Sequence, residues 1–180
     1  MKKILLIGTG GTIASKQTGG GLTPGMEAQE ILEYVPEMAK ICEMDVLQLC
    51  NIDSTNMEPE VWTKLVLAIK ENYDKYEGFV ILHGTDTMAY TSAALSYMVQ
   101  NSRKPIVITG AQQPIDTDGT DAKVNLRDSI IYACDDYSEN VVLVFDGNVI
   151  AGTRAKKMRA RSFNAFHSVN FPVLARIQDS

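Results

Sequence analysis

The sequence is poor in the residues that build metal centres and disulfide frameworks. Its 180 residues include only three cysteines and two histidines, namely Cys42, Cys50, Cys134, His83 and His167. The cysteines are widely spaced and form no C-x-x-C pair, which argues against a zinc site and against a disulfide framework. We therefore expect reduced cysteines in the core and no metal site.

The chain also lacks long apolar runs and an excess of positive charge. No stretch approaches the roughly 20 apolar residues that a transmembrane helix needs. The apolar run in the opening MKKILLIGTGG is too short for a signal peptide and leads straight into glycines. The net charge of -5 gives no general attraction to nucleic acid or to membrane surfaces. These features predict a soluble, cytoplasmic protein that binds neither nucleic acid nor membranes.

What the sequence does contain is an alternation of short apolar runs with segments of helical spacing. The expected strands are 4–8, 46–49, 79–82, 105–109 and 141–145, and the expected helices are 27–35, 59–73, 87–100 and 121–134. This alternation is typical of crossover units in a parallel sheet. The tripeptide DGN then leads into an apolar run at 149–152, which predicts a C-terminal hairpin. We expect one α/β domain over 1–180, with a doubly wound, mostly parallel sheet and helices on both faces.

Small clusters of glycines, hydroxyls and carboxamides or carboxylates follow four of these apolar runs. They lie at 9–12, 53–55, 83–87 and 110–112. In open parallel sheets, ligands bind beyond the carboxyl ends of the strands. We therefore expect the four clusters to share one pocket.

A glycine-rich segment follows the first strand. Residues 18–25 hold four glycines and one proline, so we expect no stable element there. Its place beside the polar end of the first strand makes it a candidate lid over the pocket. The alternative is an ordinary surface loop.

The GTGGTIAS sequence after the first strand does not fit a dinucleotide-binding turn. The pattern G-x-G-x-x-G would need a glycine where Ile13 stands. A hydroxyl on a glycine turn is better explained as a nucleophile, held where backbone N–H groups can stabilise an oxyanion. The alternative is that Thr9 and Thr12 only satisfy backbone groups of the turn.

The HGTDT turn and a basic segment together offer a second reactive set. Asp86 or Thr87 could simply cap the following helix, but a base reaching Thr85 would make a hydroxyl–base unit oriented by a carboxylate. The segment RAKKMRAR at 154–161 supplies such a base, although a solvated face or an anion-binding patch would look the same. A lysine acts as a base only when neutral, so its ordinary pKa of about 10.4 must be lowered by burial or by neighbouring cations.

Taken together, these motifs resemble those of L-asparaginase, in particular the cytoplasmic type I enzymes. The segments that carry the resemblance are TGGTI at 9–13, IDST at 52–55, HGTDT at 83–87, ITGAQ at 108–112, and RAKK with the later AFHS at 165–168. The resemblance covers almost the whole chain. It implies hydrolysis of asparagine to aspartate and ammonia without a cofactor, and a homo-oligomer, either a dimer or a tetramer.

The resemblance also implies roles for particular residues. Thr12 would be the nucleophile, and Thr85, Asp86 and Lys157 would form the set that activates it. Lys157, and not Lys156, falls on the family position. Backbone N–H groups near Gly11 and Thr85 would stabilise the oxyanion. The substrate-binding residues implied are Gly11, Asp53, Ser54, Thr55, Gly84 and Ala111, with Asp53 to Thr55 holding the α-carboxylate and α-amino groups and Asp86 also facing the amino group.

Two features depart from the family pattern. Leu22 stands where the family's flexible loop commonly presents a tyrosine, so activation would rest more on Lys157. The family chain also continues into a smaller C-terminal domain, which is absent from these 180 residues. We therefore expect slow turnover from this chain alone. Two other functions remain open: a glutaminase or amide-releasing subunit of an amidotransferase, and a ligand-binding or dimerisation domain without turnover.

Overall fold

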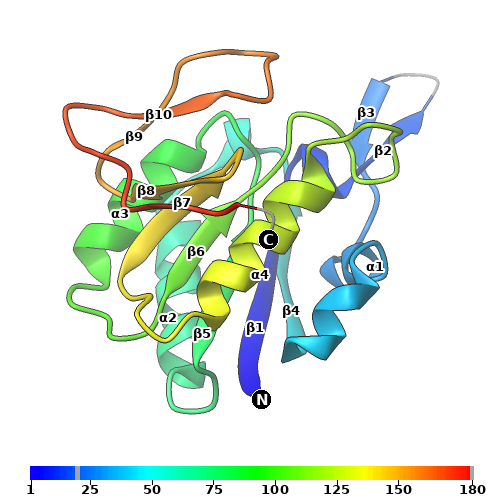
Figure 1. The fold of residues 1–180 in the computed structure, drawn as a ribbon. Coiled ribbons are helices and arrows are strands. Elements are labelled where there is room, and N and C mark those ends of the chain that lie inside the picture. The colour runs from blue at the N-terminus through cyan, green and yellow to red at the C-terminus, as the bar shows by residue number, and fades with distance from the viewer. Residues whose placement is uncertain (19–20, 179–180) are drawn as a thin grey trace.

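The computed structural model, which describes residues 1–18 and 21–178, is built around one seven-stranded sheet (Figure 1). The strand order is β11-β8-β7-β6-β5-β1-β4, and the five strands from β7 to β4 run parallel. The strands of this sheet are β1 (Lys2–Gly10), β4 (Cys42–Ile52), β5 (Gly78–Leu82), β6 (Ile106–Thr109), β7 (Val141–Phe145), β8 (Asn148–Ala151) and β11 (Ala175–Arg176). The mostly parallel α/β sheet predicted from the sequence is thus confirmed.

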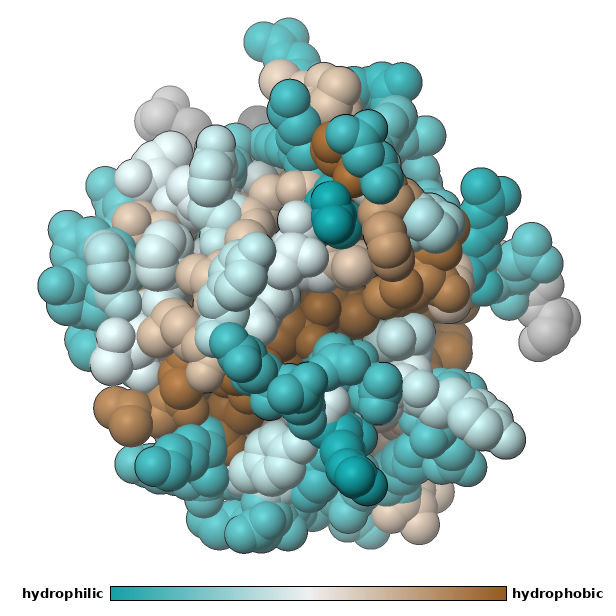
Figure 2. All heavy atoms as spheres, turned by 90° about the vertical axis from the view of Figure 1, so that its left-hand side faces the viewer, coloured by the Kyte–Doolittle hydropathy of each residue, from teal (hydrophilic) through white to brown (hydrophobic). Residues whose placement is uncertain are grey.

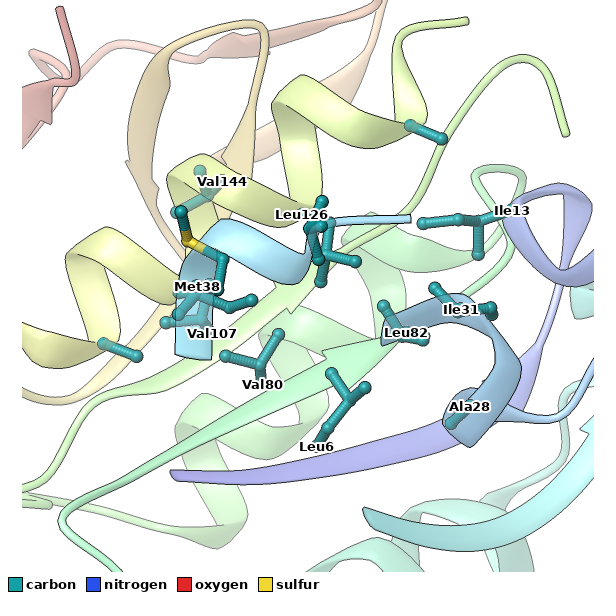
Figure 3. Close-up of a cluster of buried hydrophobic side chains, with 14 of the residues drawn as sticks. Leu6, Ile13, Ala28, Ile31, Met38, Val80, Leu82, Val107, Leu126 and Val144 are labelled. Atoms are coloured by element: carbon teal, nitrogen blue, oxygen red, sulfur yellow. The ribbon is translucent and has the colours of Figure 1, made fainter. Parts of the chain in front are cut away.

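The helices cover both faces of this sheet. They are α1 (Ala28–Leu32), α2 (Pro59–Asn72), α3 (Met88–Met98) and α4 (Ala122–Cys134), with short 3-10 turns η1 (Thr12–Ala14), η2 (Pro36–Lys40) and η3 (Ser54–Asn56). Alternate residues of β1 point to opposite faces, so Ile4 and Leu6 pack with α1 and α4, whereas Leu5 and Ile7 pack with α2 and α3. Figure 3 shows the first of these clusters, where Leu6 and Val80 of the sheet face the helices. None of the helices in the described ranges is long and apolar enough to cross a membrane.

The chain changes direction across the sheet at β1. From β1 it passes through α1 to β4 on one side, and from β4 through α2 to β5 on the other side. The carboxyl ends of β4, β1 and β5 therefore surround a topological switch point, where helices on opposite faces leave a crevice. The sheet itself thus positions a site at this edge.

The predicted C-terminal hairpin is present as β7 and β8, which pair antiparallel. Asp146 and Gly147 form its turn with φ values of 50° and 69°. Two consecutive positive φ values match the right-handed twist of the flanking strands and explain the Asp-Gly sequence. β11 pairs with the outer edge of β8.

The prediction that 18–25 forms no stable element was wrong. Four residues of this segment form β3 (Gly21–Pro24), which pairs antiparallel with β2 (Ser15–Thr18). Pairing satisfies the backbone N–H and C=O groups whatever the side chains are, so glycine does not prevent a short strand here. The segment 19–20 lies outside the described residues. The predicted helix 27–35 is also shorter than expected, because α1 ends at Leu32 and the chain enters η2 at Pro36.

Candidate active site

Three turns at the carboxyl edge of the sheet enclose a small pocket of about 150 Å³. The residues that line it follow β1 (Gly11, Thr12 and Ser15), β4 (Asp53 and Ser54) and β5 (Gly84, Thr85 and Asp86). A hollow of this size suits a small polar molecule. The structure therefore brings three of the four predicted polar clusters to one pocket.

Two glycines allow the turns to approach so closely. Gly11 has a φ of 86°, and a Cβ added there would lie 2.4 Å from the Cα of Gly84. A Cβ on Gly84 would lie 2.5 Å from the hydroxyl oxygen of Ser54. Any side chain at either position would therefore force the pocket apart.

Lys157 enters the site from a separate hairpin. β9 (Ala155–Lys157) pairs antiparallel with β10 (Phe166–Ser168), and Lys157 lies opposite Phe166. Phe166 is anchored in the core, with its ring 5.0 Å from that of Phe145. Because side chains alternate along a strand, Lys157 turns inward and its neighbour Lys156 is exposed.

The side-chain nitrogen of Lys157 contacts two side chains of the HGTDT turn. Its Nζ donates to the hydroxyl of Thr85 and to a carboxylate oxygen of Asp86, both at 2.7 Å. The Lys157 side chain is 18% exposed and that of Asp86 is 59% exposed, so the pair lies at the rim of the pocket. Of the set predicted as Thr85, Asp86 and Lys157, Lys157 is thus within hydrogen-bond distance of both other members.

Gln112 is a member of the site that the sequence reasoning missed. Its side-chain oxygen accepts a hydrogen bond from the Thr85 hydroxyl at 3.2 Å. Its side-chain nitrogen donates to the carbonyls of Ala160 and Ser162, both at 3.1 Å, which ties the segment after Lys157 to the site. The signal was present in the sequence, since Gln112 ends the polar cluster that follows β6.

The backbone of Gln112 is held in turn by a buried carboxylate. Asp121 accepts hydrogen bonds from the backbone N–H groups of Gln112 and Gln113. Burial raises the pKa of Asp121 above its ordinary value, although these hydrogen bonds act in the opposite direction.

One backbone N–H group of the Thr12 turn is already engaged within the fold. The Gly11 N–H donates to the carbonyl of Ile52 at 3.1 Å, so this N–H is not available as an oxyanion donor. Thr12 itself is half-buried beside the pocket. Its hydroxyl makes no hydrogen bond within residues 1–18 and 21–178, which leaves it accessible to a ligand.

Of the remaining predicted binding residues, two line the pocket and two do not. Asp53 and Ser54 line the pocket, and Asp53 caps η3 by accepting from the N–H and the hydroxyl of Thr55 at 2.8 Å and 2.9 Å. Thr55 is exposed and is not among the lining residues. The methyl group of Ala111 is buried in the core and does not line the pocket either. In the described part of the chain, no group of three acidic, histidine or cysteine side chains is placed to hold a metal ion.

Comparison with known proteins shows which family the chain belongs to. The asparaginase N-terminal family model matches residues 3–180. An L-asparaginase of Thermococcus kodakarensis is 40% identical over 98% of this chain and 54% of its own length. A component of the glutamyl-tRNA(Gln) amidotransferase of Metallosphaera sedula is 36% identical over 97% of this chain and 42% of its own length.

A solved structure extends the likeness to the fold. The probable cytoplasmic L-asparaginase of Campylobacter jejuni superposes with a TM-score of 0.90 at 27% identity, over 99% of this chain and 55% of the other. The chain thus spans about half the length of the relatives it matches. On the match to the N-terminal family model and the 40% identity, this chain belongs to the asparaginase family.

Proposed function

We propose that the site hydrolyses the side-chain amide of L-asparagine through an acyl-enzyme on Thr12. The observation that carries this proposal is the contact of Lys157 with both Thr85 and Asp86 at the rim of the pocket that Thr12 lines. A hydroxyl, an amine and a carboxylate joined by hydrogen bonds form the kind of unit that activates a nucleophile without histidine.

In the first step, the Thr12 hydroxyl oxygen attacks the amide carbon of asparagine. A bond forms between this oxygen and the carbon, and the proton of Thr12 passes to the unit of Thr85 and Lys157. The unit returns a proton to the amide nitrogen as the carbon–nitrogen bond breaks, and ammonia leaves. Water then hydrolyses the aspartyl ester, which releases aspartate and restores the Thr12 hydroxyl.

The shape and charge of the pocket support a small zwitterionic substrate. Its volume of about 150 Å³ suits a single amino acid. Asp53 and Asp86 supply carboxylates that attract the α-ammonium group, and the turn of Ser54 offers hydrogen bonds to the α-carboxylate. Since Thr55 does not line the pocket and its hydroxyl donates to Asp53, we assign it to supporting Asp53 and not to binding substrate.

Ammonia release from asparagine tests this proposal directly. The wild-type protein should release ammonia and aspartate in equal amounts, and hydroxylamine should divert part of the product to aspartyl hydroxamate, because a nucleophile can intercept an acyl-enzyme. Thr12→Ala is the matched control and should yield neither product. Binding of aspartate without any ammonia release would instead support the non-catalytic ligand-binding function.

A second candidate is release of ammonia from glutamine. The similarity to a component of a glutamyl-tRNA(Gln) amidotransferase favours it. Glutamine is longer than asparagine by one methylene, which a pocket discriminates by only about 1 to 3 kcal/mol. Parallel assays with both amides decide between them, and we expect the higher kcat/KM with asparagine because the pocket is small.

We also infer that the chain is cytoplasmic and that it assembles with copies of itself. Figure 2 shows apolar side chains gathered along a hollow on the side of the molecule that carries α3 and the β9–β10 hairpin. Tyr90 and Val169 are exposed apolar residues that line a hollow reaching Asp86 and Lys157. Phe171 and Leu174 are exposed apolar residues that line a second hollow. Sedimentation of the purified protein measures the assembly.

A further inference from the structure

His83 lies directly behind the turn that carries Thr85. It is completely buried, and its backbone N–H donates to the carbonyl of Thr109 at 2.8 Å, which fixes it at the end of β5. Its ring nitrogen Nδ1 lies 2.7 Å from the carbonyl oxygen of Gly84. Its other ring nitrogen, Nε2, lies 2.9 Å from the hydroxyl of Thr91 on α3.

The partners of the ring fix its tautomer. A carbonyl oxygen only accepts hydrogen bonds, so Nδ1 carries the hydrogen and donates to Gly84. Nε2 then accepts from the Thr91 hydroxyl, and the Thr91 oxygen accepts from the indole N–H of Trp62 at 2.9 Å. Each donor in this series of three hydrogen bonds therefore has an acceptor. Burial lowers the pKa of His83 to about 4, which keeps the ring neutral at pH 7.

The hydrogen bond to the Gly84 carbonyl also fixes the direction of the Thr85 N–H, which belongs to the same peptide plane. In a trans peptide, the C=O of one residue and the N–H of the next point in opposite directions. The Gly84 carbonyl is directed at the buried imidazole, so the Thr85 N–H faces away from it, toward the pocket that Gly84 and Thr85 line. This N–H donates to no acceptor in the described residues.

A glycine peptide needs such a restraint. Glycine has no Cβ to limit its backbone angles, so the plane between Gly84 and Thr85 can rotate at little cost unless its carbonyl is held. A larger residue could not supply the stiffness, because a Cβ on Gly84 would lie 2.5 Å from the Ser54 hydroxyl. The site thus combines a close approach that requires glycine with a hydrogen bond that immobilises it.

We propose that His83 is a positioning residue, which holds the Gly84 carbonyl so that the Thr85 N–H points at the oxyanion formed from the substrate amide. This inference rests on the proposed amide hydrolysis. A donor that is aimed before the reaction begins stabilises the charge that develops in the transition state without a cost of reorganisation. His83 acts through Gly84 and touches neither substrate nor nucleophile.

A matched pair of variants separates positioning from packing. Asn and Leu have nearly the same shape, but only Asn retains an N–H at the place of Nδ1. We expect His83→Leu to lower kcat by roughly tenfold to a hundredfold, within the range for a misplaced oxyanion donor. His83→Asn should retain most of kcat. KM for asparagine should change little in both, because Asp53 and Asp86 hold the ground state.

Thr91→Val is the control for structural damage. It removes the hydrogen bond to Nε2 but leaves the donor at Nδ1, so it should lower the melting temperature and leave kcat near that of the wild type. The proposal would be overturned if His83→Leu kept the wild-type kcat, or if His83→Asn and His83→Leu lost kcat equally while remaining folded.

A spectroscopic measurement on the wild-type protein keeps the inference testable if the variants do not fold. Nitrogen-15 NMR of the imidazole should report a neutral ring with the proton on Nδ1 at pH 7, and a proton on Nε2 would contradict the proposal. The measurement needs no turnover. Absence of ammonia release by the wild type would therefore defeat the proposed function, whereas the wrong tautomer would defeat only the role of His83.

Discussion

The two turns that carry the threonines of the pocket are held in different ways. In the turn after β5, Thr85, Asp86 and Thr87 each form a side-chain hydrogen bond to another part of the chain, and His83 holds the Gly84 carbonyl. In the turn after β1, the backbone is shaped by two glycines with φ values of 106° and 86°, and the Thr12 hydroxyl has no partner within the described ranges.

The difference is consistent with the two roles that we propose for these turns. A hydroxyl that is already hydrogen-bonded on both sides suits proton transfer, because its donors and acceptors are in place. An unengaged hydroxyl on a turn whose backbone is fixed suits attack on a substrate, because no existing bond must be broken first. A substitution in one turn should therefore leave the other turn intact.

Thr12→Ala should have the largest effect. Without the attacking oxygen, kcat should fall by more than about a thousandfold. The melting temperature should stay close to that of the wild type, because no hydrogen bond of the folded protein is lost in the described residues. Steady-state ammonia release and a thermal melt measure the two quantities. Activity within tenfold of the wild type would transfer the role of nucleophile to Thr85.

Lys157→Met should follow, with a loss of kcat of roughly a hundredfold to a thousandfold, because proton transfer loses its base. Lys156→Met is the matched control: Lys156 is the adjacent residue of β9, it is exposed, and it forms no hydrogen bond to Thr85 or Asp86. The control should retain the wild-type rate. The reverse pattern would mean that β9 is shifted by one residue and presents Lys156 to the site.

Acidification should weaken the turn after β5 through His83. The pKa of this ring falls from 6.5 to about 4 on folding, because burial opposes its charged form. A lowered histidine pKa contributes stability that is complete above pH 6.5 and is lost as the pH falls toward 4. The shift corresponds to about 3 kcal/mol. Urea unfolding of the wild type between pH 7 and pH 4 measures the loss.

His83→Asn is the reference for that experiment. The two proteins share every other titrating group, including the buried Asp121, so the difference between their pH dependences isolates the histidine. The variant should be less stable at pH 7, but its free energy of unfolding should fall less steeply on acidification. Parallel curves for both proteins would show that His83 titrates normally in the folded state.

Trp62→Phe should have the smallest effect. It removes the hydrogen bond from Trp62 to Thr91, which is the bond farthest from the pocket in the series that leads through Thr91 to His83. The loss of one such bond costs about 1 kcal/mol of stability. Turnover should remain within about twofold of the wild type, because His83 keeps its bond to Gly84. A larger loss of turnover would mean that the orientation of the Gly84 peptide depends on Trp62 as well as on His83.

The strand and helix pattern could be predicted from the sequence, and so could the polar turns that follow the strands. Continuous apolar runs defined β1, β5, β6 and β7, since a strand buried on both faces has apolar residues pointing both ways. The Asp-Gly turn predicted the hairpin after β7 because few residues adopt two positive φ angles. The family motifs predicted Thr12, Thr85, Asp86 and Lys157 as one set, and the structure brings Lys157 into contact with Thr85 and Asp86 beside the pocket that Thr12 lines.

The tertiary structure decided which of these groups meet and how they are oriented. Gln112 and Lys157 reach Thr85 from segments 27 and 72 residues away in the sequence, and no local pattern specifies that approach. The direction of an N–H group also escapes the sequence: backbone N–H groups near Gly11 were expected to stabilise an oxyanion, and only the structure shows that the N–H of Gly11 itself bonds Ile52. Side-chain type and spacing are local properties of the sequence. The orientation of a peptide plane depends instead on which buried donor forms a hydrogen bond with its carbonyl.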